Sequence, residues 1–347
     1  MKAAVYYGRE DIRIEEVPLP EITKEEILVR VISCAICGTD LRIYRYGHRK
    51  VKPPHIIGHE VAGIIEKVGK EVKDYKEGER VLLVTEVGCN LCKWCLEGRK
   101  NLCPKMKAFG YYYSGGFAQF IKIPKEAVEQ GNLIPFPDTL SFEEASLIEP
   151  FSCCINGQEY LNIGLGSKVV VIGAGPIGLM HSELAKSKGA KTVIMVDISP
   201  SRLEMAKSFS LDFLIDASKE NPVEKVKEIT GGEGADAVIV ACPSGEAQVE
   251  AIEMAGIRGR VSFFGGLPSE KSHINIDANL IHYKEIGVFG AFSSSNQHYH
   301  KALKIIKGGR VTLKKFITSS YPLDRIEEAL KILSQGKAIK IVIHPWA

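Results

Sequence analysis

Short runs of apolar and β-branched residues, broken by Gly, Pro and Asn, fill residues 1–150. Runs with this composition and these breaks are typical of strands joined by turns. We expect strands at Met1–Tyr7, Ile27–Ser33, Val61–Val68, Arg80–Val84 and Phe117–Ile123. A helix should follow Ser141, because Glu144 stands three positions later and the pair can form a capping box. The first part of the chain is therefore predicted to be rich in β-structure.

From Lys168 onward, strand-like runs alternate with stretches of helical periodicity. The six runs are Val169–Ile172, Val193–Val196, Phe213–Ile215, Ala237–Val240, Val261–Phe264 and Ile286–Phe289. Strands and helices that alternate in this way form a parallel sheet covered on both faces, so we expect a doubly wound parallel sheet. The last segment returns to shorter elements and ends on an expected strand at Lys340–Ile343.

The composition is that of a globular protein with room for two domains: 347 residues, 45% apolar and 25% charged. A net charge of +3 is too small to indicate a nucleic-acid partner. No apolar run approaches the ~20 residues that cross a bilayer, and no signal peptide is evident. The nine cysteines are odd in number and mostly clustered, which suits reduced thiols better than disulfides. We expect a soluble cytoplasmic enzyme without a membrane or nucleic-acid partner.

A glycine-rich motif follows the first strand of the alternating region and opens its first helix. Its residues are Gly173-Ala174-Gly175-Pro176-Ile177-Gly178. Gly173 permits a tight turn, Gly175 lets the backbone approach a pyrophosphate, and Gly178 allows close helix packing. Asp197 ends the next expected strand, where a carboxylate accepts hydrogen bonds from ribose hydroxyls and repels a 2′-phosphate. The motif predicts a site for NAD rather than NADP, in which Arg202 either stacks near the adenine or accommodates a phosphate.

Four cysteines follow one another closely within residues 86–104, with the spacing Cys89-x2-Cys92-x2-Cys95-x7-Cys103. Four thiolates fill the tetrahedral shell of one zinc ion and leave no position for a substrate. The spacing therefore predicts a structural zinc site in this segment, which we call the cysteine lobe.

A second set of ligand-type side chains lies outside the lobe. Cys37 follows an expected strand, His59 and Glu60 open the next one, and Glu149 precedes a proline before the alternating region. A thiolate, an imidazole and one or two carboxylates hold zinc with a position open to water or substrate. Each residue alone is more simply a core residue or a helix cap, but their combination with a zinc lobe and a dinucleotide motif favours a catalytic metal site.

With these motifs the sequence resembles the zinc-containing medium-chain dehydrogenases, especially their polyol (sorbitol) and threonine dehydrogenase branch. The resemblance covers essentially the whole chain. It is carried by the cysteine lobe, the glycine-rich motif, Cys37-Gly38-Thr39-Asp40, Gly58-His59-Glu60-Val61-Ala62-Gly63 and Ile148-Glu149-Pro150. It implies a GroES-like, β-rich catalytic domain from residues 1–151 and 291–347, with a Rossmann domain at 152–290 inserted between them.

The resemblance also implies two zinc ions per chain. The structural ion would be held by the four lobe cysteines, and the catalytic ion by Cys37, His59 and a carboxylate. In the family the Glu60 position is a ligand or is bridged through water, and the Glu149 position contacts the metal or the substrate; the sequence leaves this choice open. Cofactor contacts are implied near Gly265–Leu267 and at Phe289 and Gly290, and a homotetramer, or a dimer, is the expected assembly.

Two segments depart from the family pattern. Where many relatives read Thr-Asp-x-His, this chain reads Thr39-Asp40-Leu41-Arg42. The family's histidine passes the alcohol proton outward, whereas an arginine stays protonated at any working pH. Sorbitol dehydrogenases carry Tyr where Ile43 stands and Arg where Gly290 stands, and threonine dehydrogenases carry Arg where we align Ala291. Neither sorbitol nor threonine is therefore indicated as the substrate.

Together these features predict a zinc-dependent oxidoreductase that transfers a hydride between a secondary alcohol, polyol or sugar-derived, and NAD. Thr39 is expected to accept the hydroxyl proton, which then leaves by Glu60, a water chain or His48. The main alternative is an L-threonine-type amino alcohol dehydrogenase. A nucleic-acid-binding zinc module is disfavoured by the near-neutral charge. A sensor without turnover is disfavoured because Cys37, His59 and Glu60 are all present.

Overall fold

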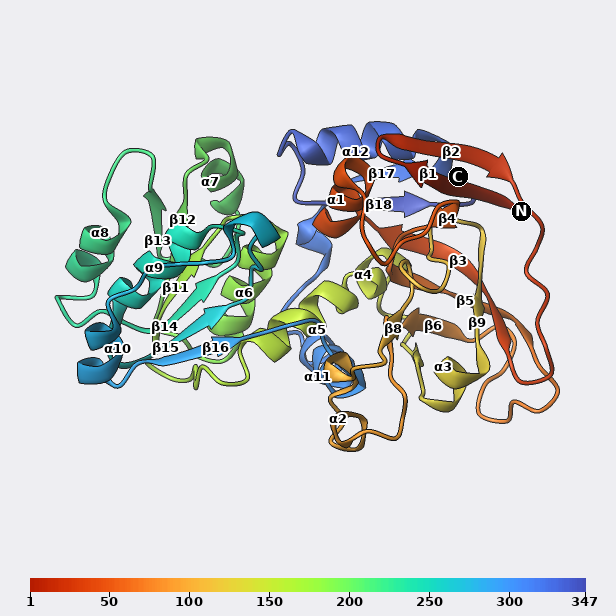
Figure 1. Cartoon of the computed structure of the whole chain (residues 1–347), viewed down its shortest axis with the longest axis horizontal. Coiled ribbons are helices and arrows are strands. Elements are labelled where there is room, and N and C mark those ends of the chain that lie inside the picture. The colour runs from red at the N-terminus through yellow and green to blue at the C-terminus, as the bar shows by residue number, and fades with distance from the viewer. The chain divides into compact units, whose positions relative to one another are not determined.

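The computed structural model describes all 347 residues, which form two compact units. Unit 1 comprises Met1–Ser152, Ser294–Lys307 and Thr312–Ala347, so both ends of the chain belong to it (Figure 1). Unit 2 comprises Cys153–Ser293 and Gly308–Val311. Neither unit contains a helix with the length and hydropathy required to span a bilayer.

Unit 1 is built on a seven-stranded sheet with the order β10-β6-β5-β3-β18-β17, in which β9 also pairs with β3. The strands are β3 (Ile27–Ala35), β5 (Glu60–Val68), β6 (Arg80–Leu83), β9 (Phe120–Ile123), β10 (Leu133–Pro135), β17 (Ile317–Pro322) and β18 (Lys340–His344). All pairs are antiparallel except β17 with β18. The last strand of the chain, β18, thus lies directly beside β3, which comes from the first part of the chain.

The remaining elements of unit 1 are two small sheets and several short helices. One sheet pairs β2 (Asp11–Glu16), β1 (Lys2–Gly8) and β4 (His55–Ile56), and the other pairs β7 (Glu86–Val87) with β8 (Lys107–Ala108). The helices are α1 (Gly38–Tyr46), α2 (Lys93–Leu96), α3 (Lys125–Glu129), α4 (Phe142–Ser146), α11 (Asn296–Lys307) and α12 (Ile326–Ser334). Helix α5 (Ile148–Gly157) passes from unit 1 into unit 2.

The core of unit 1 follows from the alternation of its strands. Val29 and Val31 of β3 point to the same face and are buried, as is Ile65 of the neighbouring β5. Helix α12 adds Ile326, Ala329 and Leu330, whose spacing places them on one helix face. Burying each large aliphatic side chain contributes about 1.5–3 kcal/mol.

The capping box predicted at Ser141 is confirmed. The Glu144 N–H donates to Ser141 Oγ over 3.2 Å, and the Ser141 N–H donates to a Glu144 carboxylate oxygen over 3.4 Å. These two bonds satisfy backbone donors that the start of α4 otherwise leaves exposed. The local sequence therefore determines where this helix begins.

Unit 2 holds a six-stranded, entirely parallel sheet with the order β13-β12-β11-β14-β15-β16. Its strands are β11 (Lys168–Ile172), β12 (Thr192–Asp197), β13 (Phe213–Asp216), β14 (Ala235–Val240), β15 (Ala255–Phe263) and β16 (Gly287–Gly290). All six predicted strands are present, and the doubly wound fold is confirmed. Strand β15 begins six residues before the expected Val261, because its first half lacks the apolar run that marks a strand in sequence.

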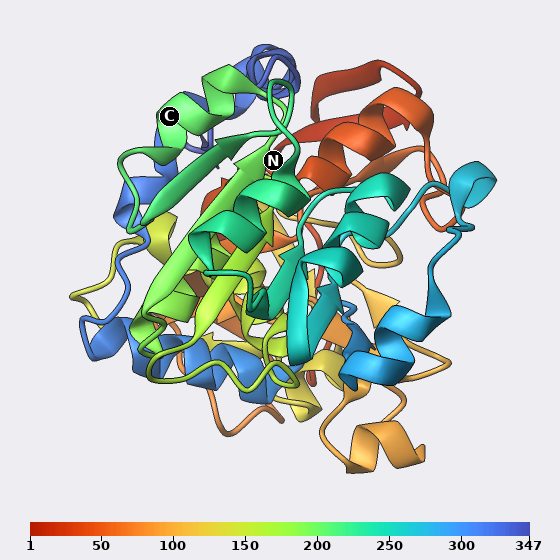
Figure 2. The ribbon, with the colours of Figure 1, turned by 90° about the vertical axis from the view of Figure 1, so that its left-hand side faces the viewer.

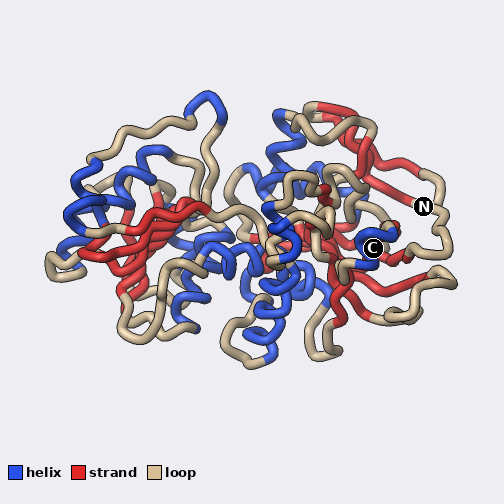
Figure 3. Tube along the Cα trace, turned by 60° about the horizontal axis from the view of Figure 1, so that its bottom comes forward, coloured by secondary structure: helices blue, strands red, loops and turns tan.

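Helices cover both faces of this sheet. They are α6 (Pro176–Ser187), α7 (Pro200–Ala206), α8 (Pro222–Ile229), α9 (Gly245–Met254) and α10 (Ala278–Lys284). Helix α6 lies on one side of the strands and α9 on the other (Figure 1), and the strands run side by side in Figures 2 and 3. The strand order reverses between β11 and β14, and sheets of this kind bind ligands at that switch point.

Candidate metal centres and cofactor site

Three ligand-type side chains converge at one end of the large sheet of unit 1. The ligand atoms of Cys37, His59 and Glu60 all lie within 4.8 Å of one another. Strand β3 pairs with β5 so that Ala35 faces Glu60, which brings the residue after β3 next to the start of β5. Cys37 caps helix α1, and its N–H donates to the Asp40 carboxylate over 2.9 Å. The pairing of these two strands and the start of α1 thus assemble the cluster from distant parts of the sequence.

His59 is oriented by the neighbouring Asp40. Both side chains are buried, and Asp40 Oδ1 lies 3.5 Å from His59 Nδ1. A carboxylate beside one ring nitrogen favours a proton on that nitrogen and leaves the other free to bind a metal. Burial lowers the pKa of His59, but the charges of Asp40 and Cys37 outweigh it and raise the pKa well above the ordinary value.

Glu60 shares its two oxygens between different tasks. Lys340 Nζ donates to Glu60 Oε2 and to the carbonyl of Ile36, the latter over 2.9 Å. Glu60 Oε1 is buried and has no hydrogen-bond partner. A buried carboxylate oxygen without a partner is costly unless a cation completes it. The cluster of thiol, imidazole and carboxylate therefore fits a zinc ion, which would satisfy Glu60 Oε1.

The charges of His59 and Glu60 act on Glu149, but Glu149 is not part of the cluster. It is buried in the first turn of α5, outside the set of three atoms within 4.8 Å. Burial raises the pKa of Glu149 to about 8, with the charges on Glu60 and Glu86 acting in the same direction and His59 opposing them. Of the two carboxylates left open by the sequence, the structure groups Glu60 with Cys37 and His59.

Two further side chains border the cluster. Arg42 Nη2 donates to Thr39 Oγ1 over 3.4 Å, so the residue that replaces the family's histidine contacts the expected proton carrier. The ring of Tyr111 lies 5.8 Å from that of His59 and 5.3 Å from that of His48. Burial raises the pKa of Tyr111 to about 12, so the phenol is protonated at neutral pH.

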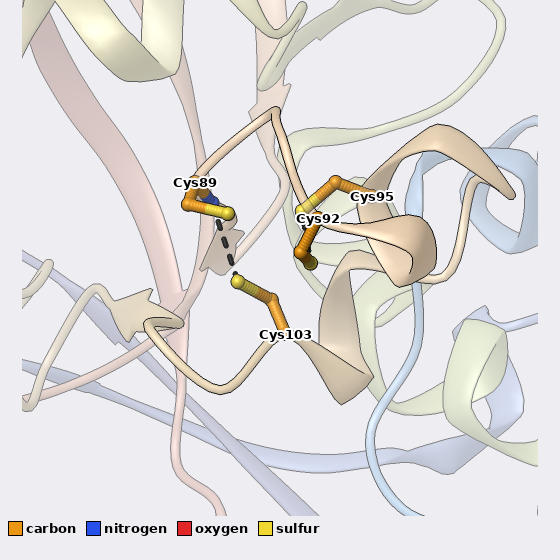
Figure 4. A group of neighbouring side chains, drawn as sticks. All are labelled: Cys89, Cys92, Cys95 and Cys103. Carbon is orange, nitrogen blue, oxygen red and sulfur yellow. Dashed lines mark hydrogen bonds between the residues drawn. The ribbon is translucent and has the colours of Figure 1, made fainter.

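The four cysteines of the lobe form a second cluster, whose sulfur atoms lie within 4.8 Å of one another (Figure 4). Cys92 Sγ and Cys95 Sγ are 3.7 Å apart, and the Cys89 N–H donates to Cys103 Sγ over 3.3 Å. Sulfur atoms placed tetrahedrally at ~2.3 Å from one zinc ion lie about 3.8 Å apart. Backbone N–H groups of Leu91 and Cys92 lower the pKa of Cys89 to about 6. The four thiols fit a closed zinc site.

In unit 2, the glycine-rich motif forms the turn between β11 and α6. Gly173 has a φ of +110°, and a Cβ on Gly178 would lie 1.8 Å from the Gly173 carbonyl oxygen. A Cβ on Gly175, the residue that caps α6, would meet no atom within 4 Å. The backbone conformation and packing therefore require glycine at positions 173 and 178, while Gly175 borders open space. Pro176 and Ile177 form the first turn of α6.

Asp197 ends β12 beside this loop. Its carboxylate accepts hydrogen bonds from the N–H groups of Ala174 (2.6 Å) and Ser199 (2.8 Å). Arg202 is exposed on the following helix, α7. The predicted acidic residue thus lies against the glycine-rich turn and is held there by two backbone donors.

The other predicted cofactor contacts lie at the half of the same sheet formed by β14, β15 and β16. Leu267 lines a cavity of about 650 Å³ at the start of α9. Phe289 is in the edge strand β16, where its ring stacks on Tyr160 at 5.4 Å, and Gly290 ends that strand. The side chain of Phe289 is therefore already packed against a protein neighbour.

Comparison with known proteins gives the family. Residues 23–137 match the alcohol dehydrogenase GroES-like domain, and residues 176–308 match the zinc-binding dehydrogenase domain. The sorbitol dehydrogenase of Bacillus subtilis (strain 168) is 35% identical over 99% of this chain and 97% of its own length. The chain belongs to the zinc-containing alcohol dehydrogenase family. The resemblance stated from sequence is confirmed, as are the GroES-like domain and the Rossmann-type sheet.

Other relatives differ in what their names say they act on and bind. The L-threonine 3-dehydrogenase of Rhizobium etli (strain CIAT 652) is 31% identical over 99% of this chain and 98% of its own. A zinc-binding dehydrogenase of Sinorhizobium meliloti 1021, solved with NADP, has a TM-score of 0.90 at 28% identity. An alcohol dehydrogenase of Escherichia coli CFT073, solved with NADH, has a TM-score of 0.90 at 27% identity. Both structures cover 99% of this chain and of their own. The protein is a zinc-dependent, NAD(P)-linked alcohol dehydrogenase.

Three residues of the catalytic end were given no role from the sequence. Lys340 could have been recognised from the sequence, because a lysine that begins an apolar strand is expected to need a buried partner. Asp40 stands within a recognised motif, but its contact with His59 depends on the strand pairing. Tyr111 is one of three consecutive tyrosines, and nothing in that run distinguishes it.

Proposed function

We propose that this enzyme oxidises a secondary alcohol of a polyol or sugar-derived substrate with NAD. Unit 1 is then the catalytic domain and unit 2 the cofactor domain. The observation that carries the proposal is the cluster of Cys37, His59 and Glu60, whose ligand atoms lie within 4.8 Å of one another. Three protein ligands leave a fourth position for the substrate hydroxyl, unlike the closed set of four cysteines.

Zinc, when bound, acts as a Lewis acid that makes the alcohol proton easier to remove. The protein holds the groups that receive this proton. Thr39 Oγ1 accepts a hydrogen bond from Arg42, which fixes the hydroxyl next to the cluster while the arginine keeps its own protons. A second lone pair of Thr39 remains to accept the substrate hydroxyl.

As Thr39 takes up the substrate proton, it releases its own hydroxyl proton, and we propose that this proton passes to water rather than to His48. His48 Nδ1 accepts the N–H of Lys50 over 3.2 Å, so its free lone pair is already used. Burial, followed by the nearby charges of Lys50, Arg42 and Arg49, lowers the pKa of His48. Both effects make His48 a poor proton acceptor.

NAD is the proposed cofactor because of Asp197. The buried carboxylate lies against the glycine-rich turn, where it would repel a 2′-phosphate and accept ribose hydroxyls. Arg202 is exposed near it and is the residue that would have to compensate a phosphate. A comparison of NAD with NADP at saturating alcohol tests this preference.

L-Threonine is the second candidate, because relatives named as L-threonine 3-dehydrogenases match the whole chain as well. L-Threonine is disfavoured by Ala291, where we align the arginine of threonine dehydrogenases, and sorbitol itself is disfavoured in the same way by Ile43 and Gly290. The proposed substrate is therefore a different polyol or a sugar-derived alcohol. A cytoplasmic location is proposed because all nine cysteines are free thiols. A homotetramer or dimer is the proposed assembly, as the family resemblance implies. Light scattering of the purified protein tests the assembly.

The test is a substrate screen with NAD that follows the absorbance of the reduced cofactor. Sorbitol, xylitol, butanediols and L-threonine are compared with the wild type, Cys37→Ala and Cys34→Ala. Cys34 is a matched control, because it is a buried thiol of β3 that lies outside the ligand cluster. We expect polyol turnover in the wild type and the control and none in Cys37→Ala. Turnover of L-threonine alone, or equal turnover in Cys37→Ala, would contradict the proposal.

A further inference from the structure

A run of basic residues with no acidic residue inside it spans the second half of α1 and the loop after it. Between Leu41 and Gly58 the chain has five arginines and lysines and no Asp or Glu. These five side chains are exposed, and none forms an ion pair. Three of the five, Arg42, Arg49 and Lys50, form together with His48 what we call the basic cluster.

The basic cluster is connected to the catalytic end of unit 1 by two independent contacts. Arg42 bonds to Thr39, two residues after the ligand Cys37. His48 packs edge-on against Tyr111, whose other neighbour is the ligand His59. The cluster is therefore linked to the metal-binding side chains through Thr39 on the helix and through Tyr111.

The three positive charges of the cluster act on the side chain of His48. Lys50, Arg42 and Arg49 all act on the half-buried imidazole of His48, after burial itself, and lower its pKa. The Lys50 N–H occupies His48 Nδ1, so the neutral ring carries its proton on Nε2 and can donate there. Three cations around the partly buried ring of His48 repel one another and attract an anion, to which the neutral ring can donate a hydrogen bond.

We propose that the basic cluster is a subsite for an anionic group, a phosphate or a carboxylate, on the polyol that the enzyme oxidises. The proposal rests on the proposed function and names its substrate class. Arginine and lysine bind such groups through charge-assisted hydrogen bonds, and arginine matches both of them in shape. The cluster could bind the carboxylate of L-threonine as well, but residues 41–58 offer no carboxylate to receive its ammonium group.

The test compares three substrates with closely related carbon skeletons: sorbitol, sorbitol 6-phosphate and gluconate. The ratio of kcat/KM for an anionic substrate to that for sorbitol is measured in the wild type, Arg42→Ala, Arg49→Ala/Lys50→Ala and Lys73→Ala. Lys73 is the charge-matched control, because it is an exposed lysine of unit 1 outside the cluster. Inorganic phosphate is added separately as a competitive probe.

We expect at least one anionic substrate to be preferred over sorbitol by about 10-fold or more, the effect of one charge-assisted hydrogen bond. The ratio should fall about 10-fold in Arg42→Ala and in the double variant, stay at the wild-type value in Lys73→Ala, and decline with added salt. Preference for the phosphate or for the carboxylate identifies the anion. The inference would be overturned, while the proposed function stands, if kcat/KM for sorbitol equalled that for both anionic substrates. It would also be overturned if the cluster variants left the kcat/KM ratio unchanged. Failure of every polyol to reduce NAD would overturn both.

Discussion

Lys340 in the last strand donates a hydrogen bond to Glu60, which lies 280 residues earlier and opens β5. Both side chains are buried, with exposed fractions of 3% and 0%. Strand β18 pairs with β3, and β3 pairs with β5, so these two strand pairings bring the lysine to the metal cluster. The C-terminal strand therefore contributes to the catalytic end of unit 1.

Replacing Lys340 with Met should leave the Glu60 carboxylate buried without its cation. Breaking one side of a buried ion pair costs about 3–5 kcal/mol, so the free energy of unfolding should fall by that amount. Urea denaturation at a fixed zinc concentration measures the change. The double variant Glu60→Gln/Lys340→Met should lose less than the sum of the two single variants. A loss below about 1 kcal/mol in Lys340→Met would mean that the pair is not formed.

The two glycines of the dinucleotide turn should respond differently to alanine. Gly178→Ala places a Cβ against the Gly173 carbonyl, so it should lower the free energy of unfolding by about 1–3 kcal/mol or more. Gly175→Ala meets no protein atom, so it should keep the Tm and instead raise the Kd for NAD. Thermal unfolding and a cofactor titration separate the two effects. Equal Tm losses in both variants would contradict the packing described.

The fold and the ligand residues could be predicted because their signals are local. The strands of unit 2, the glycine turn and the spacing of Cys89 to Cys103 are each complete within a short stretch of sequence. The contacts of Lys340 with Glu60, and of Tyr111 with His59, depend on which strands and loops meet. No periodicity or spacing records such pairings, so these partners could be seen only in the structure.

His181 predicts a pH dependence of stability. It is fully buried in α6, and burial, followed by the charge of Lys188, lowers its pKa from 6.5 to about 3. His181 is therefore protonated below about pH 6.5 in the unfolded chain, but only below about pH 3 in the folded protein. Protonation of His181 in the unfolded chain has no effect above pH 6.5. As the pH falls from 6.5 toward 3 it lowers the free energy of unfolding, with a slope of up to about 1.4 kcal/mol per pH unit.

Urea unfolding between pH 7 and 4 tests this dependence in the wild type and two variants. His181→Gln should flatten the slope by close to one proton, because no titratable group remains at the buried position. His300→Gln, at an exposed position of α11, is the control and should keep the wild-type slope. An unchanged slope in His181→Gln would show that the histidine titrates alike in both states.

The cysteine lobe should hold its metal independently of the catalytic cluster. Cys95→Ser replaces a thiolate with a poorer zinc ligand, so the zinc content should fall from two ions per chain to one and the Tm by several degrees. Elemental analysis after gel filtration measures the content. Cys34→Ala should retain both ions. Loss of both ions in Cys95→Ser, with the fold intact by circular dichroism, would contradict two separate sites.

The most direct measurement is anomalous diffraction at the zinc absorption edge from crystals of the zinc-loaded protein. We predict two peaks per chain: one inside the four cysteines of the lobe, and one bonded to Cys37, His59 and Glu60 with a fourth position left open. A single peak in the lobe, with no metal at Cys37 in a catalytically active preparation, would contradict this prediction.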